Sequence, residues 1–244
     1  MQRQIMGIIN VTPDSFYAKS RVESSSALIA TAKRMVADGA DIIDIGACST
    51  RPNSVPVDAE TEWQRLRPAL QTVRKELPEV ALSIDTFQPT VAQRALDEFG
   101  PMIINDVSGG CDEMYQVVRS FRVPYVWTLR GDYTQLARIR ALEGVSLILD
   151  PGLGFTGGVE SDYKCLRAMD QLSSYGCPVL VGVSRKSMLF RLLNTTPEEC
   201  LAPTQVLHLY ALQHGATILR VHDVREARQT LTLYQKLNEQ IVNN

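Results

Sequence analysis

Residues 24–46 read SSSALIATAKRMVADGADIIDIG and predict a helix followed at once by a buried strand. The segment Ser24–Asp38 opens on serines that suit helix capping, and Gly39 ends it. The next segment, Asp41–Ile45, is a short apolar run of the kind found in parallel strands that are covered on both faces. This stretch therefore predicts an α/β fold in which helices and strands alternate.

The same alternation continues along the chain with a period of about 30 residues, the length of a βα unit. Further strands are predicted over Ile5–Ile9, Ala81–Ile84, Met102–Ile104, Val123–Trp127, Val145–Leu149, Pro178–Val183 and Ala216–Val221. Further helices are predicted over Asp58–Leu77, Thr90–Phe99, Asp162–Tyr175, Pro197–His214 and Asp223–Ile241, with shorter ones near Asp112–Ser120 and Tyr133–Leu142. Eight strands with helices between them predict one (β/α)8 TIM barrel domain over residues 1–244. The alternative, a doubly wound open sheet, usually has a Gly-x-Gly-x-x-Gly turn after its first strand, which this chain lacks.

The composition is that of an ordinary globular protein. Of the 244 residues, 45% are hydrophobic and 21% are charged, and the formal net charge of −2 does not favour nucleic-acid or anionic-membrane partners. The five cysteines form no Cys-x-x-Cys pair, and the three histidines lack zinc-ligand spacing. We therefore expect a protein of the cytoplasm without disulfides, zinc or a membrane span.

Polar residues follow the predicted strands, although the strands themselves are overwhelmingly apolar. A single Asp after a strand is usually a turn or capping residue, but that explanation is poor for a whole ring. Barrel enzymes build their active sites at the carboxyl ends of the strands, which predicts an active site there. The residues at these positions are Asn10, Asp44, Asp85, Asn105, Thr128, Asp150, Ser184 and His222.

Two kinds of chemistry are indicated within this ring. Asp85, Asn105 and Asp150 suit the amino and ring N–H groups of an amino-pyrimidinone heterocycle, because buried carboxylates need donors. A metal could bind the two acids instead, but no His or Glu accompanies them. The motifs Ser184-Arg185-Lys186-Ser187 and Arg220-Val221-His222-Asp223 follow strands seven and eight, where barrels often bind phosphate. Arg185 could equally have a structural role.

Taken in order, these motifs resemble the dihydropteroate synthase family of folate-pathway transferases. The resemblance rests on MGIINVTPDSF at 6–16, GADIIDIG at 39–46, STRP at 49–52, SIDT at 83–86, INDV at 104–107, DPGLGF at 150–155, SRKS at 184–187 and RVHD at 220–223. It covers nearly the whole chain. The resemblance implies a magnesium-assisted condensation of 6-hydroxymethyl-7,8-dihydropterin pyrophosphate with 4-aminobenzoate, giving 7,8-dihydropteroate and pyrophosphate.

The resemblance also implies a role for individual residues, with catalysis by Asp85, Lys186, Arg220 and His222. The pterin would be bound by Asp85, Asn105, Asp150, Lys186 and Arg220. The pyrophosphate would be bound by Asn10, Thr50, Arg51, Arg220 and His222, with Asn10 near magnesium. The aminobenzoate pocket, which is also the sulfonamide target, would be lined by Phe16, Pro52, Phe155 and Ser187. The resemblance further implies a homodimer formed through the last helices.

Three loops depart from the family pattern. Where the family has Ser-Asp-Gly-Gly, His-Met-x-Gly and Gly-Phe-Gly-Lys, this chain has Tyr17-Ala18-Lys19-Ser20, Thr128-Leu129-Arg130-Gly131 and Gly154-Phe155-Thr156-Gly157. An Asp and a Lys are thereby missing, which predicts an active synthase with changed aminobenzoate or sulfonamide affinity. Two alternatives stay open: a methyltetrahydrofolate-dependent corrinoid methyltransferase on the same barrel, and a pterin-binding paralogue without turnover.

Overall fold

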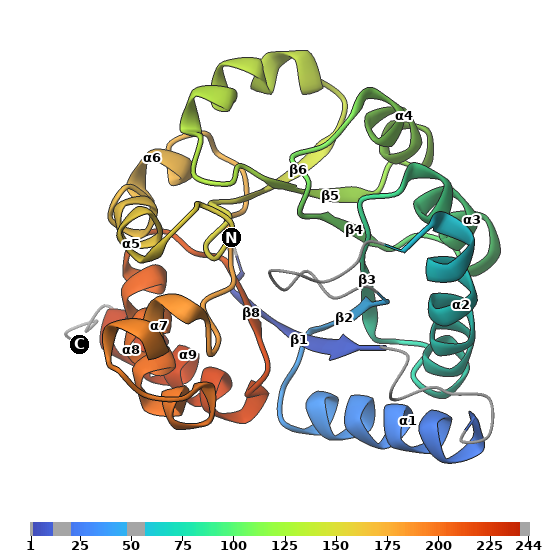
Figure 1. The fold of residues 1–244 in the computed structure, drawn as a ribbon, viewed down its shortest axis with the longest axis horizontal. Helices are drawn as coiled ribbons and strands as arrows, with labels where there is room; N and C mark the ends of the chain where they lie inside the picture. Colours follow the sequence, from blue (N-terminus) through green and yellow to red (C-terminus); the bar gives the residue numbers. More distant parts are fainter. Residues whose placement is uncertain (1, 12–20, 48–56, 240–244) are drawn as a thin grey trace, which may run out of the picture.

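The chain folds as a barrel of parallel strands with helices outside it, as Figure 1 shows for the computed structural model, which describes residues 2–11, 21–47 and 57–239. The strands are β1 (Gln4–Asn10), β2 (Ile42–Gly46), β3 (Ala81–Asp85), β4 (Ile103–Asp106), β5 (Pro124–Thr128), β6 (Ser146–Asp150), β7 (Leu180–Val181) and β8 (Ile218–Val221). Their order in the sheet is β6-β5-β4-β3-β2-β1-β8-β7. A parallel bridge between Leu149 and Val179 joins the two ends of the sheet. The predicted (β/α)8 barrel is confirmed.

The helices lie on the outside of the barrel and begin and end at recognisable signals. They are α1 (Arg21–Ala37), α2 (Ala59–Glu76), α3 (Pro89–Phe99), α4 (Asp112–Phe121), α5 (Val159–Arg167), α6 (Asp170–Ser173), α7 (Ser187–Leu192), α8 (Leu201–Gln213) and α9 (Val224–Asn238), with 3₁₀ helices η2 (Tyr133–Leu142) and η3 (Pro197–Cys200). Asp58 caps α2 by accepting a 2.8 Å hydrogen bond from the Thr61 amide. Among the described residues, no helix is both long and apolar enough to cross a bilayer.

Three sequence predictions need correction between β6 and β8. The single helix predicted over Asp162–Tyr175 is divided into α5 and α6, because the chain turns at Ala168 to bury Met169 and Leu172 completely. Helix α7 was not predicted, since its six residues are too few to show a helical period. Strand β7 is shorter than the predicted Pro178–Val183. In each case tertiary packing decided what the local pattern left open.

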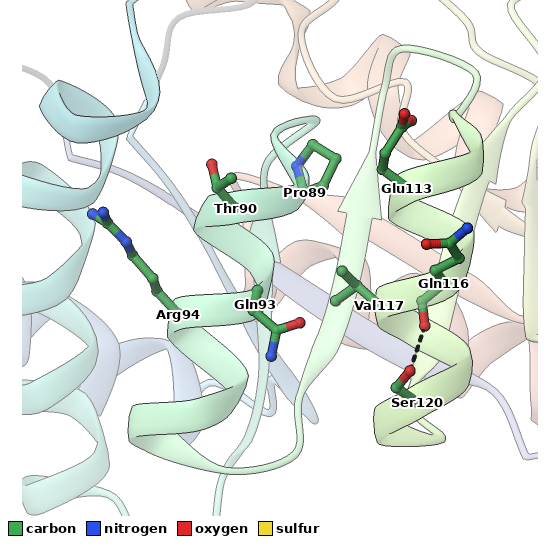
Figure 2. A pocket seen from close by; sticks show the side chains of 8 residues that line it. All are labelled: Pro89, Thr90, Gln93, Arg94, Glu113, Gln116, Val117 and Ser120. Carbon is green, nitrogen blue, oxygen red and sulfur yellow. Dashed lines mark hydrogen bonds between the residues drawn. The ribbon is translucent and has the colours of Figure 1, made fainter.

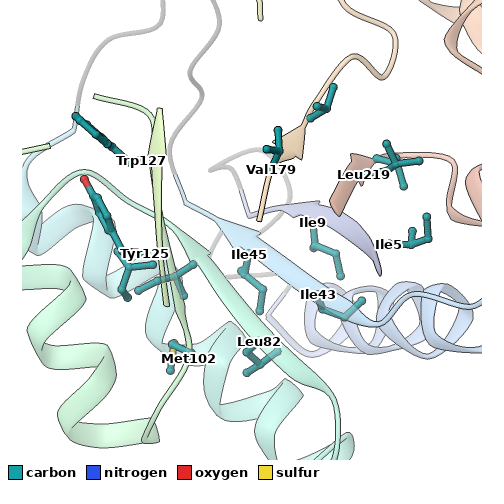
Figure 3. Packing of buried hydrophobic residues seen from close by; sticks show 14 of the residues in the cluster. Ile5, Ile9, Ile43, Ile45, Leu82, Met102, Tyr125, Trp127, Val179 and Leu219 are labelled. Atoms are coloured by element: carbon teal, nitrogen blue, oxygen red, sulfur yellow. The ribbon is translucent and has the colours of Figure 1, made fainter. Parts of the chain in front are cut away.

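Successive strand residues face opposite sides of the sheet and form two apolar clusters. The large outer cluster lies between the strands and the helices and includes Ile5, Ile43 and Leu219 (Figure 3). The smaller cluster lies inside the barrel and consists of Met6, Ile42, Val126, Ile148, Leu180 and Ile218. Polar side chains follow two residues further along the same inward face of several strands, and they form the candidate site.

Candidate active site

The inward-facing polar residues at the strand ends are brought together by the register of the parallel strands. Asp85 is paired with Asn105 across β3 and β4, and Thr128 with Asp150 across β5 and β6. Asp44, on the inward face of β2, lies one strand away from Asp85. All five side chains are at least nine-tenths buried. Five of the eight residues that the sequence places at the strand ends therefore form a buried polar layer above the inner apolar cluster.

Arg220 occupies the centre of this layer and binds two carboxylates. Its Nε donates a 2.7 Å hydrogen bond to Oδ2 of Asp44, and its Nη2 donates one of 2.7 Å to Oδ2 of Asp85. Burial by itself disfavours a charged guanidinium, but Asp44 and Asp85 outweigh that effect and raise the pKa of Arg220. Two carboxylates thus share one cation.

That sharing has a consequence for Asp85. Burial raises its pKa to about 7, and the nearby carboxylate of Asp44 adds to the rise, while Arg220 acts in the opposite direction. One guanidinium does not fully offset the burial of Asp85 beside a second carboxylate, so Asp85 takes up a proton more readily than an exposed acid does. Asp85 is therefore a group that can both accept and donate near neutral pH.

Several buried acceptors in this layer have no hydrogen-bond partner within the described part of the chain. They include Oδ1 of Asp44, Oδ1 of Asn105 and Oγ1 of Thr128, while Nδ2 of Asn105 donates to Asp44 at 3.2 Å. A buried polar atom left unpaired costs about 1–3 kcal/mol, so such atoms usually face a ligand or water. Their position fits a polar ring compound bound at the strand ends.

Lys186 lies between the acids and the loop that follows β6. Its Nζ donates to the Leu153 carbonyl and lies 5.2 Å from the centre of the Phe155 ring. Burial lowers the pKa of Lys186 to about 8, partly offset by the charge of Asp150. Burial likewise raises the pKa of Asp150, which Lys186 partly offsets. A Cβ on Gly154 would lie 3.1 Å from Cδ of Lys186, and its φ of +87° also favours glycine.

Two residues predicted to bind the pyrophosphate, Asn10 and His222, and one predicted for the aminobenzoate pocket, Ser187, are more exposed than this layer. Asn10 and His222 are exposed at the ends of β1 and β8, and Ser187 is the partly exposed first residue of α7. The His222 amide donates a 3.3 Å hydrogen bond to Oγ of Ser184. Of the other predicted site residues, Phe16, Thr50, Arg51 and Pro52 lie outside the described residues, as does the divergent segment Tyr17–Ser20.

Sequence reasoning placed Asp44 in the ring but gave it no role, and it left the role of Arg185 open. The sequence signal for Asp44 was an acid inside an otherwise apolar strand. Arg185 forms an ion pair with Asp223 at 2.8 Å and donates to the carbonyls of Pro197 and Glu198, so its contacts are structural ones. Its φ of +53° is in the left-handed region, which costs a non-glycine residue about 1–3 kcal/mol.

Two hollows formed by the described residues contain none of the predicted site residues. One of about 510 Å³ lies between α3 and α4 and is lined by polar side chains such as Thr90, Gln93 and Gln116 (Figure 2). Another of about 570 Å³ lies at the opposite end of the barrel, where Gln4, Ile42 and Ile218 line it. The concentration of buried charge at the carboxyl strand ends is the better guide to chemistry.

The chain is similar to known proteins over most of its length. The chain matches the model of the family described as pterin binding enzyme over residues 6–135 and 128–222. It is 34% identical to the dihydropteroate synthase of Bacillus subtilis, over 96% of this chain and 89% of that protein.

Two solved structures have the same fold. The dihydropteroate synthase of Xanthomonas albilineans with 4-aminobenzoic acid superposes with a TM-score of 0.88 at 34% identity, covering 98% of this chain and 94% of that one. The Yersinia pestis enzyme in complex with a sulfonamide drug gives a TM-score of 0.85 at 29% identity, covering 97% and 94%. The chain belongs to the pterin binding enzyme family.

Proposed function

We propose that the chain is a dihydropteroate synthase, a transferase of folate biosynthesis. It condenses 6-hydroxymethyl-7,8-dihydropterin pyrophosphate with 4-aminobenzoate and releases 7,8-dihydropteroate and pyrophosphate. The observation that carries the proposal is the buried layer of Asp44, Asp85, Asn105 and Asp150, in which Arg220 binds the first two acids and Lys186 lies near Asp150. The names of the B. subtilis, X. albilineans and Y. pestis relatives support the same activity.

In this proposal the pterin ring binds to the acidic part of the layer. Asp85, Asn105 and Asp150 accept hydrogen bonds from its amino and ring N–H groups, which satisfies the unpaired oxygen of Asn105. Arg220 donates to Oδ2 of Asp85, and the second oxygen of that carboxylate can accept a hydrogen bond from the pterin. Lys186 and Arg220 complete the pterin site.

The pyrophosphate binds to the cationic part. Arg220 and His222 come from β8 and its end and Asn10 from β1, while Thr50 and Arg51 follow β2 in the sequence. When the bond between the pterin methylene carbon and the pyrophosphate oxygen breaks, the anion takes the electron pair and the 4-aminobenzoate nitrogen bonds to the carbon. The amine loses a proton to solvent. Fixed cations stabilise the charge that develops on the leaving group, so no covalent intermediate with the enzyme is needed.

Magnesium is part of the proposal, with Asn10 as its protein ligand. Oδ1 of Asn10 would lie 3.5 Å from a Cβ on Gly46, so the absent side chain leaves space beside this oxygen. Within the described ranges no three His, Cys, Asp or Glu side chains form a metal cluster. Mg²⁺ commonly keeps several waters and binds substrate phosphates, which fits a site with a single protein oxygen. When bound, the ion would neutralise part of the pyrophosphate charge.

The aminobenzoate pocket is proposed at Phe16, Pro52, Phe155 and Ser187, which is also where a sulfonamide would compete. Phe155 is partly buried beside Lys186, and Ser187 begins α7. The altered loop residues Thr128–Gly131 and Thr156–Gly157 lie close to each other, since a Cβ on Gly131 would lie 3.1 Å from Cγ2 of Thr156. We expect the inhibition constant of a sulfonamide to differ from that of family members with the usual loops, as measured by competition against 4-aminobenzoate.

The assay that tests this function measures pyrophosphate release with both substrates and magnesium. We expect turnover by the wild-type protein, loss of turnover on chelation by EDTA, and a loss on the order of 1,000-fold in the Asp85→Asn variant, because an acceptor facing the pterin becomes partly a donor. Undiminished activity in Asp85→Asn would show that Asp85 lies outside the pterin site.

Two outcomes of the same assay would favour the alternatives. If no dihydropteroate forms but methyl groups pass from methyltetrahydrofolate to a corrinoid protein, the methyltransferase is correct. If calorimetry detects pterin binding and adding 4-aminobenzoate releases no pyrophosphate, the chain is a paralogue without turnover. The predicted pyrophosphate-binding group of Arg51, Lys186, Arg220 and His222 favours the synthase, because methyl transfer releases no such anion.

We also propose a cytoplasmic homodimer that associates through the last helices. Val206 on α8 is 67% exposed, and Leu233 and Leu237 on α9 are 65% and 78% exposed. Exposed aliphatic side chains on two packed helices suit a contact with a second copy of the chain. A molecular mass near 54 kDa in light scattering, twice the chain mass of 27.1 kDa, would support the dimer, and a monomer at micromolar concentration would contradict it.

A further inference from the structure

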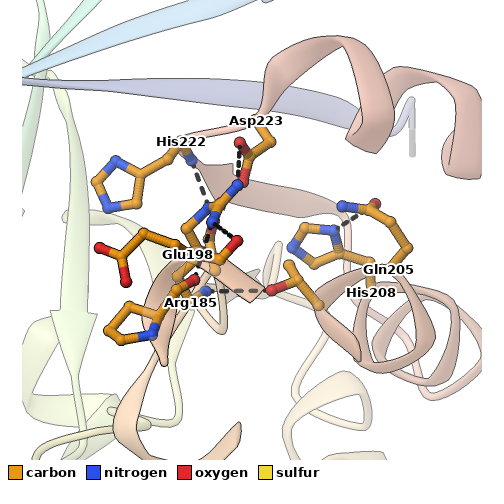
Figure 4. A network of polar contacts seen from close by, with 9 residues as sticks. Arg185, Glu198, Gln205, His208, His222 and Asp223 are labelled. Carbon is orange, nitrogen blue, oxygen red and sulfur yellow. Dashed lines mark hydrogen bonds and ion pairs between the residues drawn. The ribbon is translucent and has the colours of Figure 1, made fainter. Parts of the chain in front are cut away.

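Arg185 forms a dense set of polar contacts beside the proposed site, drawn in Figure 4. Its Nε and Nη2 bind the two carboxylate oxygens of Asp223 at 2.8 and 3.0 Å. Its Nη1 donates to the carbonyls of Pro197 and Glu198 at 2.8 and 2.7 Å, and its amide donates to Oγ1 of Thr204 at 3.1 Å. We call these five residues the Arg185 network. A two-point contact with a carboxylate is the geometry in which an arginine is most specific.

The Arg185 network joins two segments that carry predicted site residues. Arg185 directly precedes Lys186, and Asp223 directly follows His222. A second bond fixes the same two segments to each other, because the His222 amide donates to Ser184. Through η3 and α8, the network also holds the chain that follows α7. The loop after β7 and the end of β8 are thereby locked in one relative position.

The backbone of Arg185 is in the left-handed region, and the adjacent side chains of Arg185 and Lys186 make separate sets of contacts. Lys186 reaches the Leu153 carbonyl and the Phe155 ring on the side of the active site. The Arg185 side chain extends to Asp223 and η3. A non-glycine residue keeps such a backbone only where its surroundings compensate for the strain, and the five hydrogen bonds of Arg185 supply that compensation.

We propose that Arg185 is a positioning residue of the synthase, which holds Lys186 and His222 in the relative placement that binding and release of the pyrophosphate substrate require. The proposal rests on the proposed function. Arg185 does not itself contact substrate in this scheme. Its loss would leave the loop after β7 free to move, and a displacement of 1 Å can cost on the order of 100-fold in rate.

Arg228 on α9 provides a matched control at the other end of the barrel. It binds one carboxylate, Asp41, and the Gly39 carbonyl, and its side chain is 30% exposed compared with 25% for Arg185. Arg185→Met and Arg228→Met therefore remove similar interactions from similar surroundings. Only the first lies next to predicted site residues.

The experiment compares the kinetics and the thermal stability of the two methionine variants. We expect both to lower Tm. For Arg185→Met we expect kcat/KM for the dihydropterin pyrophosphate to fall about 10- to 100-fold. For Arg228→Met we expect kcat/KM to stay within about two-fold of the wild-type value. Each variant is assayed about 20 degrees below its own Tm. Arg185→Lys, which keeps the charge but lacks the two-point contact, should recover part of the loss. Equal kinetic effects in Arg185→Met and Arg228→Met would overturn the proposal.

A second readout needs no turnover, so it separates this proposal from the proposed function. The pH dependence of Lys186 acetylation, followed by peptide mass spectrometry, reports the pKa of that amine in the wild-type protein and in each variant. We expect the midpoint to rise towards 10.5 in Arg185→Met and to stay near its wild-type value in Arg228→Met. An unchanged midpoint in Arg185→Met would overturn the positioning role even if the wild-type protein is an active synthase. If Arg185→Met does not fold, Asp223→Asn and Arg185→Lys replace it in both measurements.

Discussion

The inside of the barrel contains two layers that differ sharply although they come from the same faces of the same strands. On five strands an inward-facing apolar residue is followed, two positions towards the carboxyl end, by an inward-facing polar residue. The pairs are Ile42 and Asp44, Ile103 and Asn105, Val126 and Thr128, Ile148 and Asp150, and Ile218 and Arg220. The lower layer is apolar and buried. The upper layer contains shared charges and unpaired oxygens.

This difference shows how one scaffold separates stability from function. Burial of apolar surface in the lower layer stabilises the folded protein, and this layer needs no ligand. In the upper layer, burial of acids and of a guanidinium opposes folding, and the ion pairs offset this free-energy cost only in part. Such a layer is retained for what it binds. Mutations in the two layers should therefore have different signatures.

The largest effect should come from removing the cation of the upper layer. Arg220→Met leaves Asp44 and Asp85 buried without their partner, and breaking such a pair costs about 3–5 kcal/mol of unfolding free energy. The cost should be smaller at pH 5 than at pH 8, because the acids can then be neutralised by protons. Urea unfolding at both pH values measures it, and a pH-independent loss would show that charge is not the cause.

A mutation in the lower layer should lower stability without changing the chemistry. Ile148→Ala creates a cavity inside the barrel and should lower the unfolding free energy by about 3 kcal/mol. Well below the Tm of the variant, kcat and KM should stay within about two-fold of wild type, since the polar layer keeps its own contacts. A large change in KM for the pterin substrate would mean that the two layers are coupled.

The upper layer should also make stability depend on pH. The pKa of Asp85 rises on folding from 3.8 to about 7, so the folded protein holds this proton more tightly than the unfolded chain does. The stabilisation is complete below pH 3.8 and is lost as the pH rises through 7. Between these values the unfolding free energy of the wild type should fall relative to Asp85→Asn by up to about 1.4 kcal/mol per pH unit. A constant difference from pH 5 to pH 7 would contradict the raised pKa.

The smallest effect belongs to the outer surface. The ion pair of Arg67 and Glu98, between α2 and α3, has side chains that are 51% and 36% exposed. Arg67→Ala should therefore lower the unfolding free energy by less than about 0.5 kcal/mol and leave turnover unchanged. A loss as large as that of Ile148→Ala would mean that the helical layer contributes more than its solvent exposure indicates.

The sequence allowed the barrel and most of the polar layer to be predicted. Apolar runs at a regular spacing identify buried parallel strands, and the polar residues after Ile84, Ile104 and Leu149 could be read directly. It did not allow α7 or the break between α5 and α6 to be predicted. The break depends on how Met169 and Leu172 pack against the core, and the six residues of α7 are too few to show a helical period.

The sequence by itself determined which residue types stand at the strand ends, because the period of strands and helices fixes those positions along the chain. Only the tertiary structure decided which of these side chains are in contact. Arg220 is 176 residues from Asp44 in sequence and 135 from Asp85, yet it binds both. Arg185 likewise meets Asp223 only because β7 and β8 are neighbours in the closed sheet. Contacts between residues so far apart depend on barrel closure, which no local pattern encodes.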